Sequence, residues 1–502
     1  MERQSSLPLR VRVRRSCHSA KTRYPASVQE LVRKHSRFFL TAMAAGFALR
    51  LIFIFFFARL TNDSYIYGDI AKNWLQHGVY ALSDAGGFSP TYIRLPGYPA
   101  FLAAMFWIFG MEHYRAVLIV QMFVDMGACF LIADLARRLV SDRAARAAFL
   151  LAALCPFLAD YVSAPLSETL EVFFTALALD LALVGLTQLN PKRMLPWVGC
   201  GLAVGMAILL RPDGGLLLAA IELYLAVIVV REGAKGSRAR MRVPTRNFAA
   251  WFKAIFVVGF CALILLIPWT VRNLRTLHRF QPLAPRYANA SDEYVPAGFN
   301  RWVKTWIADY SSTEAIYWNV PGSAIDSSLL PNRAFDSPQQ REQTLQLIDD
   351  YNQSQEIAPA LDSRFAALAA QRVNASPTRY YIWLPTLRIA DMWLRPRTEK
   401  LPCNSRWWEF DEDPQWMALM IALGVINLAY IGAAAAGLVR NTFIGPIGIL
   451  LLFTVLRSLF LGTLENPEAR YTLECYPVVI VLASALTGRF IGRADLESTS
   501  KK

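Results

Sequence analysis

Residues 38–75 read FFLTAMAAGFALRLIFIFFFARLTNDSYIYGDIAKNWL, and this stretch decides the fold class. Its first part, Phe38 to Leu60, is an apolar run long enough to cross a hydrocarbon core of about 30 Å, for which a helix needs about 20 residues. An acidic residue, Asp63, follows three positions after the run ends. The stretch therefore predicts a membrane span followed by a carboxylate at the level of the lipid headgroups.

The composition of the whole chain is that of a protein that crosses the membrane many times. Of the 502 residues, 55% are hydrophobic and 18% are charged, whereas soluble chains carry about 25% charged residues. We therefore expect an all-α polytopic membrane protein with a bundle of about ten transmembrane helices. The expected spans are residues 38–60, 115–139, 144–161, 166–187, 194–210, 214–231, 250–271, 415–438, 442–462 and 473–490.

The net charge of +14 indicates topology rather than nucleic-acid binding. Lysine and arginine gather near the N-terminus, in residues 137–146 and in residues 231–246, and these clusters alternate with the apolar spans. Cytoplasmic loops carry such an excess of basic residues. We therefore expect both termini in the cytoplasm. No short apolar segment with a cleavage site follows the basic N-terminus, so no cleaved signal peptide is expected.

This topology divides the chain into five regions. They are a basic cytoplasmic segment (1–37), an N-terminal transmembrane module (38–275) with a first external loop (61–114), an external loop domain (276–414), C-terminal transmembrane helices (415–490) and a cytoplasmic tail (491–502). In the first external loop, the apolar stretch Pro99 to Gly110 is too short to cross and predicts an interfacial helix.

The external loop domain is expected to be small and mainly helical. The spacing of apolar residues and the lack of helix breakers predict helices over Gln339–Tyr351 and Leu361–Val373. The domain is also rich in aromatic residues, among them Trp302 and Trp306. Such rings can stack on sugars, but tryptophan is common as an anchor at membrane surfaces, and we favour that interpretation.

The cysteines do not predict a disulfide framework. Cys129, Cys155, Cys200 and Cys261 fall inside apolar spans, where a thiol is usually a small packing residue. Cys403 and Cys475 can both lie outside the cytoplasm, and the sequence leaves open whether they form a disulfide. No CxxC or His-rich metal pattern occurs.

Asp63 is the first candidate for chemistry. In a helix, Asp63 and Tyr67 share one face because they are four positions apart, whereas Asp69 points away from that face. Ile70 lies on an adjacent apolar face that suits a helix resting on the membrane. The alternative is that Asp63 is the N-cap of this helix, since aspartate is a favoured capping residue.

Two other external residues are candidate partners of Asp63. Arg94 precedes the rigid turn Pro96-Gly97-Tyr98-Pro99, and an arginine held there can bind phosphate oxygens through two hydrogen bonds. Glu168 starts the fourth span on the same side of the membrane, where a carboxylate can orient an acceptor, accept a proton or hold a metal. The alternatives are a headgroup anchor for Arg94 and helix-dipole stabilisation for Glu168.

Further arginines stand at the external membrane edge or inside the spans. Arg272 and Arg470 are at the edge, where arginines are common anchors. Charged residues within spans usually face the bundle interior, paired or lining a pathway, and they equally suit a transporter. These residues are Arg50, Asp125, Glu171, Glu222 and Arg457.

Five short motifs occur in order along the chain. They are Asp63-Ser64-x-x-Tyr67-x-x-x-Ala71-x-Asn73-x-Leu75, Arg94-x-Pro96-Gly97-Tyr98-Pro99, Ser167-Glu168-Thr169, Pro268-Trp269-x-x-Arg272-Asn273 and Glu468-x-Arg470-Tyr471. In this order and with this topology, the chain resembles the GT-C glycosyltransferases, specifically the bacterial family 39 and aminoarabinose-transferase-like branch, relatives of the protein O-mannosyltransferases. The resemblance covers residues 38–275 and 415–490, and the 276–414 loop shows no recognisable substrate-binding signature.

The resemblance implies an inverting glycosyltransferase of the bacterial inner membrane. It would take a sugar from a polyprenyl-phosphate donor on the outer face and pass it to a hydroxyl of an envelope lipid, a polysaccharide or a protein. The family's first-loop aspartate falls on Asp63, which would be the general base. The family's basic residue beside the Pro-rich turn falls on Arg94, which would stabilise the departing lipid phosphate.

The resemblance assigns lesser roles to other residues. Arg272 and Arg470 would be secondary phosphate contacts, and Glu168 takes the second acidic position. We expect Tyr67 and Tyr98 to contact substrate as well. Members of the family differ in metal use, so no cofactor is assigned and the sequence leaves a divalent cation open.

Two rival functions remain from the sequence. The buried charges are also typical of a transporter or lipid flippase without covalent chemistry, although such proteins commonly show internal repeats or paired broken helices, and neither is found. The other rival is an envelope-assembly scaffold that keeps the fold without catalysis. The sequence identifies neither the sugar nor the acceptor.

Overall fold

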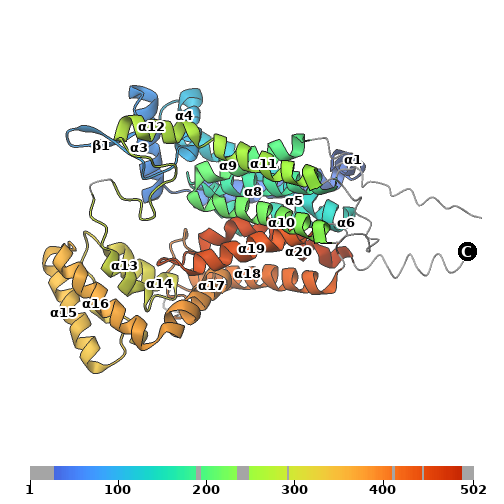
Figure 1. Ribbon diagram of the computed structural model, residues 1–502. Coiled ribbons are helices and arrows are strands. Elements are labelled where there is room, and N and C mark those ends of the chain that lie inside the picture. Colours follow the sequence, from blue (N-terminus) through green and yellow to red (C-terminus); the bar gives the residue numbers. More distant parts are fainter. Residues whose placement is uncertain are drawn as a thin grey trace, which may run out of the picture.

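The computed structural model describes residues 28–187, 194–234, 248–290, 293–409, 413–441, 443 and 446–488. Long helices lie side by side in one bundle, and shorter helices cluster at one of its ends (Figure 1). The expectations for residues 1–27, for the basic loop 235–247 and for the tail 491–502 lie outside the described residues.

The bundle forms because most of its helices are apolar over nearly their whole length. Its members are α2 (Ser36–Phe56), α5 (Tyr114–Leu139), α6 (Asp142–Ala153), α7 (Pro156–Val162), α8 (Glu168–Thr187), α9 (Leu195–Leu210), α10 (Gly215–Ala234), α11 (Phe248–Ile264), α18 (Pro414–Arg440), α19 (Gly448–Gly462) and α20 (Tyr476–Ser484). A 3₁₀ turn precedes α10 (η1, Pro212–Gly214), and two others flank α20 (η6, Ala469–Cys475, and η7, Ala485–Gly488).

Hydropathy predicted about ten spans, and fewer helices of the described residues have full membrane-crossing length. Among the described residues, seven helices are long and apolar enough to cross a membrane, or eight if the bent pair α6 and α7 is one span. The apolar helices α9 and α19 are shorter, and they fall on the expected spans 194–210 and 442–462. The prediction of an all-α polytopic membrane bundle is confirmed.

The third span is broken, and a proline marks the break. α6 ends at Ala153, and α7 begins at Pro156 at an angle of 48° to it. Proline lacks a backbone N–H and its ring clashes with the preceding turn, so a continuous helix through Pro156 is disfavoured. The bend leads the chain into the turn before Glu168.

Two of the charged residues inside the bundle, Arg50 and Asp125, form a buried ion pair. Arg50 of α2 donates from Nε to Asp125 Oδ2 of α5 at 2.6 Å, and its Nη2 donates to the carbonyl oxygen of Ala152 in α6 at 3.3 Å. Both Arg50 and Asp125 are almost completely buried. A buried charge without a partner is strongly destabilising, so this pair holds three helices in register. We assign these two charges to helix packing.

The two ends of the bundle differ. α1 (Val28–Lys34) and the junction of α5 with α6 lie at one end, with Arg33, Lys34, Arg137 and Arg138 in the last turns of α1 and α5 (Figure 1). α3 (Asn62–His77), which carries Asp63, and α4 (Gly97–Phe109), which follows the turn that carries Arg94, lie at the other end. These basic residues therefore lie at the end of the bundle opposite the candidate site.

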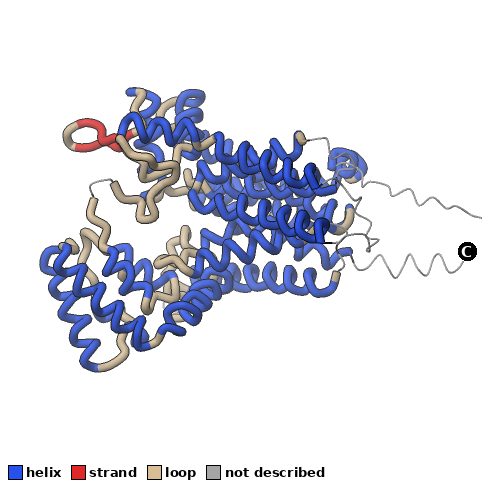
Figure 2. Tube along the Cα trace, in the orientation of Figure 1, coloured by secondary structure: helices blue, strands red, loops and turns tan. Residues whose placement is uncertain are grey.

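The first external loop forms a small cap of its own. It contains α3 (Asn62–His77), the strands β1 (Ala81–Asp84) and β2 (Gly87–Pro90), and α4 (Gly97–Phe109), and it packs on α12 (Ile267–Leu277). The strands form an antiparallel hairpin in which Leu82 faces Ser89 and Ser83 faces Phe88. This hairpin, the one strand pair of the described residues (Figure 2), was not predicted.

The long external loop has a second hydrophobic core. Its helices are α13 (Ala297–Lys304), α14 (Tyr310–Ala315), α15 (Pro338–Ser354), α16 (Pro359–Ala375) and α17 (Leu384–Leu394), with short turns at Tyr317–Asn319, Ser327–Leu329, Asn332–Ala334 and Arg379–Trp383. The helices predicted over Gln339–Tyr351 and Leu361–Val373 are confirmed as α15 and α16. Trp302 and Trp306 are fully buried between these helices, so the interpretation as membrane anchors was wrong for both.

Candidate active site

Asp63 stands in the first turn of α3, but it does not cap the helix. The N-cap is Thr61, whose Oγ1 accepts a hydrogen bond from the Ser64 backbone N–H at 3.3 Å. In return, Ser64 Oγ accepts from the Thr61 N–H at 3.2 Å, which completes a capping box. The alternative interpretation of Asp63 as the cap was therefore wrong, and its carboxylate is left for other contacts.

Those contacts are two arginines from distant parts of the chain. Arg94 Nη2 donates to Asp63 Oδ1 at 2.8 Å, and Arg470 Nη1 donates to Asp63 Oδ2 at 3.1 Å. About a quarter of the Asp63 side chain (26%) is exposed. Burial alone would raise the pKa of Asp63, but the guanidinium groups of Arg470 and Arg94 outweigh it and lower the pKa from 3.8 to about 2. Asp63 is therefore a fixed anion in this arrangement.

The turn that carries Arg94 is fastened on several sides. Tyr80 Oη donates to the carbonyl oxygen of Arg94 at 3.0 Å, and Arg94 Cζ lies 5.8 Å from the centroid of the Tyr67 ring. Gly97, where α4 begins, packs on the last turn of α9. A Cβ at position 97 would lie 2.6 Å from the carbonyl oxygen of Leu209, which is backbone and cannot rotate away. Only glycine permits this close approach.

Gly97→Ala is therefore expected to move the Arg94 turn away from α9. Overpacking of this kind costs about 1–3 kcal/mol, so we expect a lower melting temperature in detergent and weaker ligand binding through Arg94. Thermal unfolding monitored by fluorescence checks the first effect. Gly86→Ala is the matched control, because a Cβ at position 86 meets no atom within 4 Å. Equal melting temperatures for the two variants would contradict the packing argument.

Tyr67 and Tyr98, the two predicted substrate-binding tyrosines, lie one beneath the other. Their ring centroids are 5.0 Å apart in an edge-to-face arrangement. Tyr98 is fully buried and donates from Oη to Gln121 Oε1 at 2.6 Å. Tyr67 retains slight exposure beside Arg94. The structure thus places Tyr98 as a support for the Tyr67 ring, in a position that a substrate does not reach.

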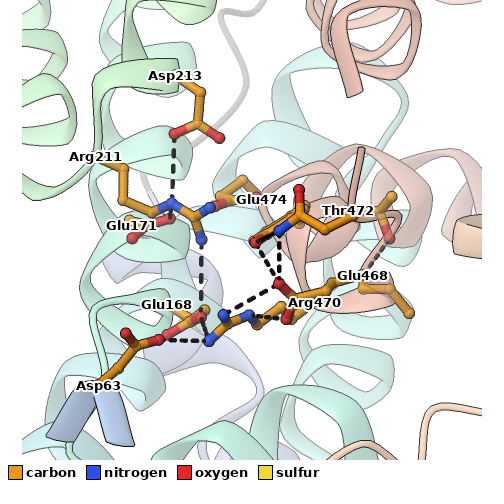
Figure 3. A network of polar contacts seen from close by, with 12 residues as sticks. Asp63, Glu168, Glu171, Arg211, Asp213, Glu468, Arg470, Thr472 and Glu474 are labelled. Carbon is orange, nitrogen blue, oxygen red and sulfur yellow. Dashed lines mark hydrogen bonds and ion pairs between the residues drawn. The ribbon is translucent and has the colours of Figure 1, made fainter. Parts of the chain in front are cut away.

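Arg470 lies among three carboxylates (Figure 3). Besides Asp63, its Nε lies 2.6 Å from Glu468 Oε2, and its Nη1 lies 3.6 Å from Glu168 Oε1. Glu168 is buried, as is Glu468. The structure therefore brings Asp63, Glu168 and Arg470 together, whereas the sequence predicted only Glu168, and not Arg470, as a neighbour of Asp63. However, an arginine already surrounded by three anions is poorly suited to attract a phosphate, which argues against the expected phosphate contact of Arg470.

The network continues from Glu168 into the bundle. Arg211 lies 3.8 Å from Glu168, 3.9 Å from Glu171 and 3.5 Å from Asp213 (Figure 3). Arg457 of α19 then pairs with Asp213 at 2.9 Å and with Glu474 at 2.6 Å. The site was not predicted to contain Arg211, Asp213, Glu468 and Glu474. Two signals were present, since Arg211-Pro-Asp213 forms a charged external turn and Glu468 belongs to the same motif as Arg470.

Arg272 is directed to the first external loop rather than to Asp63. Its Nη1 donates to the carbonyl oxygen of Thr91 at 2.7 Å, and its Nη2 donates to that of Tyr80 at 2.5 Å. Its guanidinium also lies 5.3 Å from the Trp269 ring centroid. Tyr80 in turn donates a hydrogen bond to the carbonyl oxygen of Arg94. Arg272 of α12 therefore stabilises the loop that carries Arg94. The structure shows this bracing role in place of the expected phosphate contact.

Two expectations about α3 have different outcomes. Asp69 accepts hydrogen bonds from the Ser83 N–H at 2.6 Å and from Ser83 Oγ at 2.7 Å, so it ties α3 to the hairpin and points away from Asp63 as predicted. Ile70 was expected on a membrane-facing surface, and this was wrong. It is fully buried against Tyr80 and Trp269, because α12 and the loop cover that face of α3.

A segment after α17 also reaches the site end of the bundle. Lys400 Nζ donates to Ser163 Oγ at 2.9 Å and lies 3.3 Å from Asp160 Oδ1. Burial lowers the pKa of Lys400. These contacts fasten the end of the external loop next to the turn before Glu168. No periodic pattern marks a lysine in an irregular loop, so the sequence gave no signal for this role.

Cys475 is a buried free thiol in η6, so the disulfide with Cys403 that the sequence left open is not formed. In the part of the chain that the structure describes, no group of three or more His, Cys, Asp or Glu side chains is arranged to hold a metal ion.

Comparison with known proteins agrees with the resemblance seen in the sequence. A family model described as dolichyl-phosphate-mannose-protein mannosyltransferase matches residues 90–238, which is less than half of the chain. No curated protein matches. The description of the family model agrees with the protein O-mannosyltransferase part of the predicted resemblance.

Several solved structures are similar to the chain at low identity. The apo oligosaccharyltransferase of Archaeoglobus fulgidus aligns at 13% identity with a TM-score of 0.47, covering 93% of this chain and 52% of that one. ArnT from Cupriavidus metallidurans aligns at 15% identity bound to undecaprenyl phosphate (TM-score 0.37, 93% and 80% covered) and in the apo state (TM-score 0.39, 92% and 78% covered). The chain spans about half the length of the oligosaccharyltransferase.

Proposed function

We propose that the protein is an integral-membrane glycosyltransferase that transfers a sugar from a polyprenyl-phosphate donor to an acceptor hydroxyl. One observation carries the proposal. A partly exposed carboxylate, Asp63, lies within hydrogen-bonding distance of Arg94 at the end of the bundle opposite its basic end. This pair offers a proton acceptor and a phosphate-binding cation side by side at the depth where a lipid phosphate lies. The match over residues 90–238 supports the same activity.

In this mechanism Asp63 is the general base. The acceptor hydroxyl loses its proton to the Asp63 carboxylate while its oxygen attacks the anomeric carbon. The bond between that carbon and the phosphate oxygen breaks, and its electron pair leaves on the phosphate. Direct displacement from the face opposite the phosphate inverts the anomeric centre. Arg94 stabilises the charge that develops on the phosphate, which is where a fixed cation contributes most.

The other charged residues hold this pair in place. Arg470 binds the second oxygen of Asp63 and is itself fixed by Glu468 and Glu168. Glu168 therefore orients the base through Arg470. Arg272 keeps the Arg94 loop on α12. A base whose supporting side chains are themselves fixed is positioned more accurately, and accurate placement is a large part of catalysis.

The carboxylates of this site do not fit a divalent cation. Asp63, Glu168 and Glu468 all surround the guanidinium of Arg470. Among the described residues, no three ligating side chains are arranged for a metal. No step of the proposed reaction therefore uses a metal ion.

The setting of the reaction is the outer face of a bacterial inner membrane, with both termini in the cytoplasm. The acceptor is a hydroxyl of an envelope lipid, a polysaccharide or a protein, and the sugar is a hexose or a pentose. The basic end of the bundle, opposite Asp63, supports this orientation.

Arg94→Gln tests the proposal. We expect about a 100-fold loss of kcat with a polyprenyl-phosphate sugar, because removing one fixed donor to a developing oxyanion costs about 100- to 1,000-fold. Arg115→Gln is the matched control, since Arg115 is an exposed arginine near the same loop. Transfer is measured as free polyprenyl phosphate released by purified protein in lipid. Wild-type rates in a folded Arg94→Gln variant would remove Arg94 from the role of phosphate-stabilising cation, and no transfer by the wild type itself would favour a scaffold without catalysis.

A further inference from the structure

Arg94 and Arg470 hold Asp63 in the same way but differ in their other partners. Arg470 has a second carboxylate partner, with Nε 2.6 Å from Glu468 Oε2 and Nη2 donating to Glu468 Oε1 at 3.3 Å. Arg94 has no such contact. Among the described residues its one ion pair is with Asp63 at 2.8 Å, and its Nη1 donates to its neighbour's carbonyl oxygen, that of Ile93, at 3.2 Å. An incoming anion can therefore replace Asp63 as the ion-pair partner of Arg94.

The ion pair with Arg94 also lowers the proton affinity of Asp63 and so makes it a weaker base. Each of its two oxygens accepts a hydrogen bond from a guanidinium group. A carboxylate with this double ion pair binds a proton weakly, as its pKa of about 2 indicates. Brønsted behaviour requires a base whose pKa is closer to the working pH. Removal of either arginine contact would raise the proton affinity of Asp63.

We propose that the donor phosphate and Asp63 compete for Arg94, so that donor binding releases the base. The inference rests on the proposed function and adds an order of events to it. The phosphate binds Arg94, Oδ1 of Asp63 loses its guanidinium donor, and this oxygen becomes free to accept the proton of the acceptor hydroxyl. Arg470, held by Glu468, keeps the other oxygen in place. The site then activates an acceptor only when a donor is present, which protects against unproductive turnover.

The competition predicts that removing the carboxylate strengthens phosphate binding. The probe is undecaprenyl phosphate, and undecaprenol, which lacks the phosphate, is the reference ligand. We expect Asp63→Asn to bind undecaprenyl phosphate about tenfold more tightly than the wild type, since a charge-assisted hydrogen bond of about 1.4 kcal/mol or more corresponds to at least tenfold. Binding is measured by calorimetry or by native mass spectrometry of the full-length protein in detergent.

The control variant is Glu112→Gln, which removes the same charge from the same loop. Glu112 is exposed and pairs with Lys72 at 3.5 Å, and none of its contacts is with Arg94. We expect its affinity for undecaprenyl phosphate to equal that of the wild type. If Asp63→Asn does not fold, Asp63→Ala is measured in the same way, because it also leaves Arg94 without its carboxylate.

The outcomes separate this inference from the proposed function. Tighter binding in the Asp63 variant alone supports the competition. Equal affinity in the wild type and the Asp63 variant, with both preferring the phosphate over undecaprenol, overturns the competition and leaves the proposed function standing. If Glu112→Gln also bound undecaprenyl phosphate about tenfold more tightly, the effect would come from the overall charge of the loop. That result would also overturn the competition for Arg94. If no form prefers undecaprenyl phosphate over undecaprenol, the proposed donor class fails.

Discussion

Asp63→Asn is expected to lower the rate of sugar transfer by about 100- to 10,000-fold, which is the usual contribution of a general base. Asparagine keeps the shape and an oxygen that accepts a hydrogen bond, but it cannot take the hydroxyl proton. The helix should remain intact, because Thr61 and Ser64 rather than Asp63 form its cap. The loss should therefore appear in kcat, with the KM for the donor unchanged or lower, because Arg94 stays available to the phosphate.

Steady-state kinetics over a range of donor concentrations check this expectation. The control is Asp69→Asn, which replaces the other aspartate of α3, on the side away from Arg94, where it contacts Ser83. We expect Asp69→Asn to affect mainly stability, through the hairpin. A folded Asp63→Asn variant that transfers sugar at close to the wild-type rate would remove Asp63 from the role of base.

Arg470→Gln is expected to have the second large effect, on folding as well as on activity. The substitution leaves Asp63, Glu168 and Glu468 close together without their shared cation. Removing one partner of a buried ion pair costs about 3–5 kcal/mol, because the remaining charge has lost its compensation. We therefore expect a much lower melting temperature and no measurable transfer.

A second substitution distinguishes this electrostatic effect from simple loss of packing. In the double variant Glu468→Gln/Arg470→Gln, one of the uncompensated carboxylates is neutral. We expect the double variant to recover part of the melting temperature while activity stays absent, because Asp63 is still misplaced. Thermal unfolding of the single and double variants provides the measurement. An Arg470→Gln protein as stable as the wild type would contradict the view that this arginine organises the site.

Hydropathy predicted the spans because membrane insertion depends on local composition. Phe38–Leu60 is apolar regardless of what surrounds it, and it corresponds to α2 (Ser36–Phe56). The helices of the external domain were likewise predicted from nearby residues, whereas the break at Pro156 inside the expected span 144–161 was not predicted. The hairpin of residues 81–90 was missed, because its short strands do not show a clear alternation of apolar and polar residues.

The candidate site could be predicted only in part, since its contacts join residues that are far apart in the sequence. Topology placed Asp63, Arg94 and Glu168 on one side of the membrane, and the structure brings them together. The ion pair between Asp63 and Arg470 joins positions 407 residues apart. Glu468 stands in the same motif as Arg470, but the motif alone does not show that the two side chains form an ion pair. The different roles of Arg94, which is available to phosphate, and Arg470, which is paired with carboxylates, therefore depend on the tertiary structure.

The central claim is that this protein makes a glycosidic bond and does not merely move a lipid. The most direct measurement reconstitutes the wild type and Asp63→Asn in proteoliposomes with polyprenyl-phosphate-linked sugars and envelope acceptors, and follows both products by mass spectrometry. We expect the wild type to release free polyprenyl phosphate together with an equal amount of glycosylated acceptor, and Asp63→Asn to form both products about 100- to 10,000-fold more slowly. Movement of the lipid-linked sugar across the bilayer by the wild type, with no glycosylated acceptor formed, would contradict the account and identify a flippase.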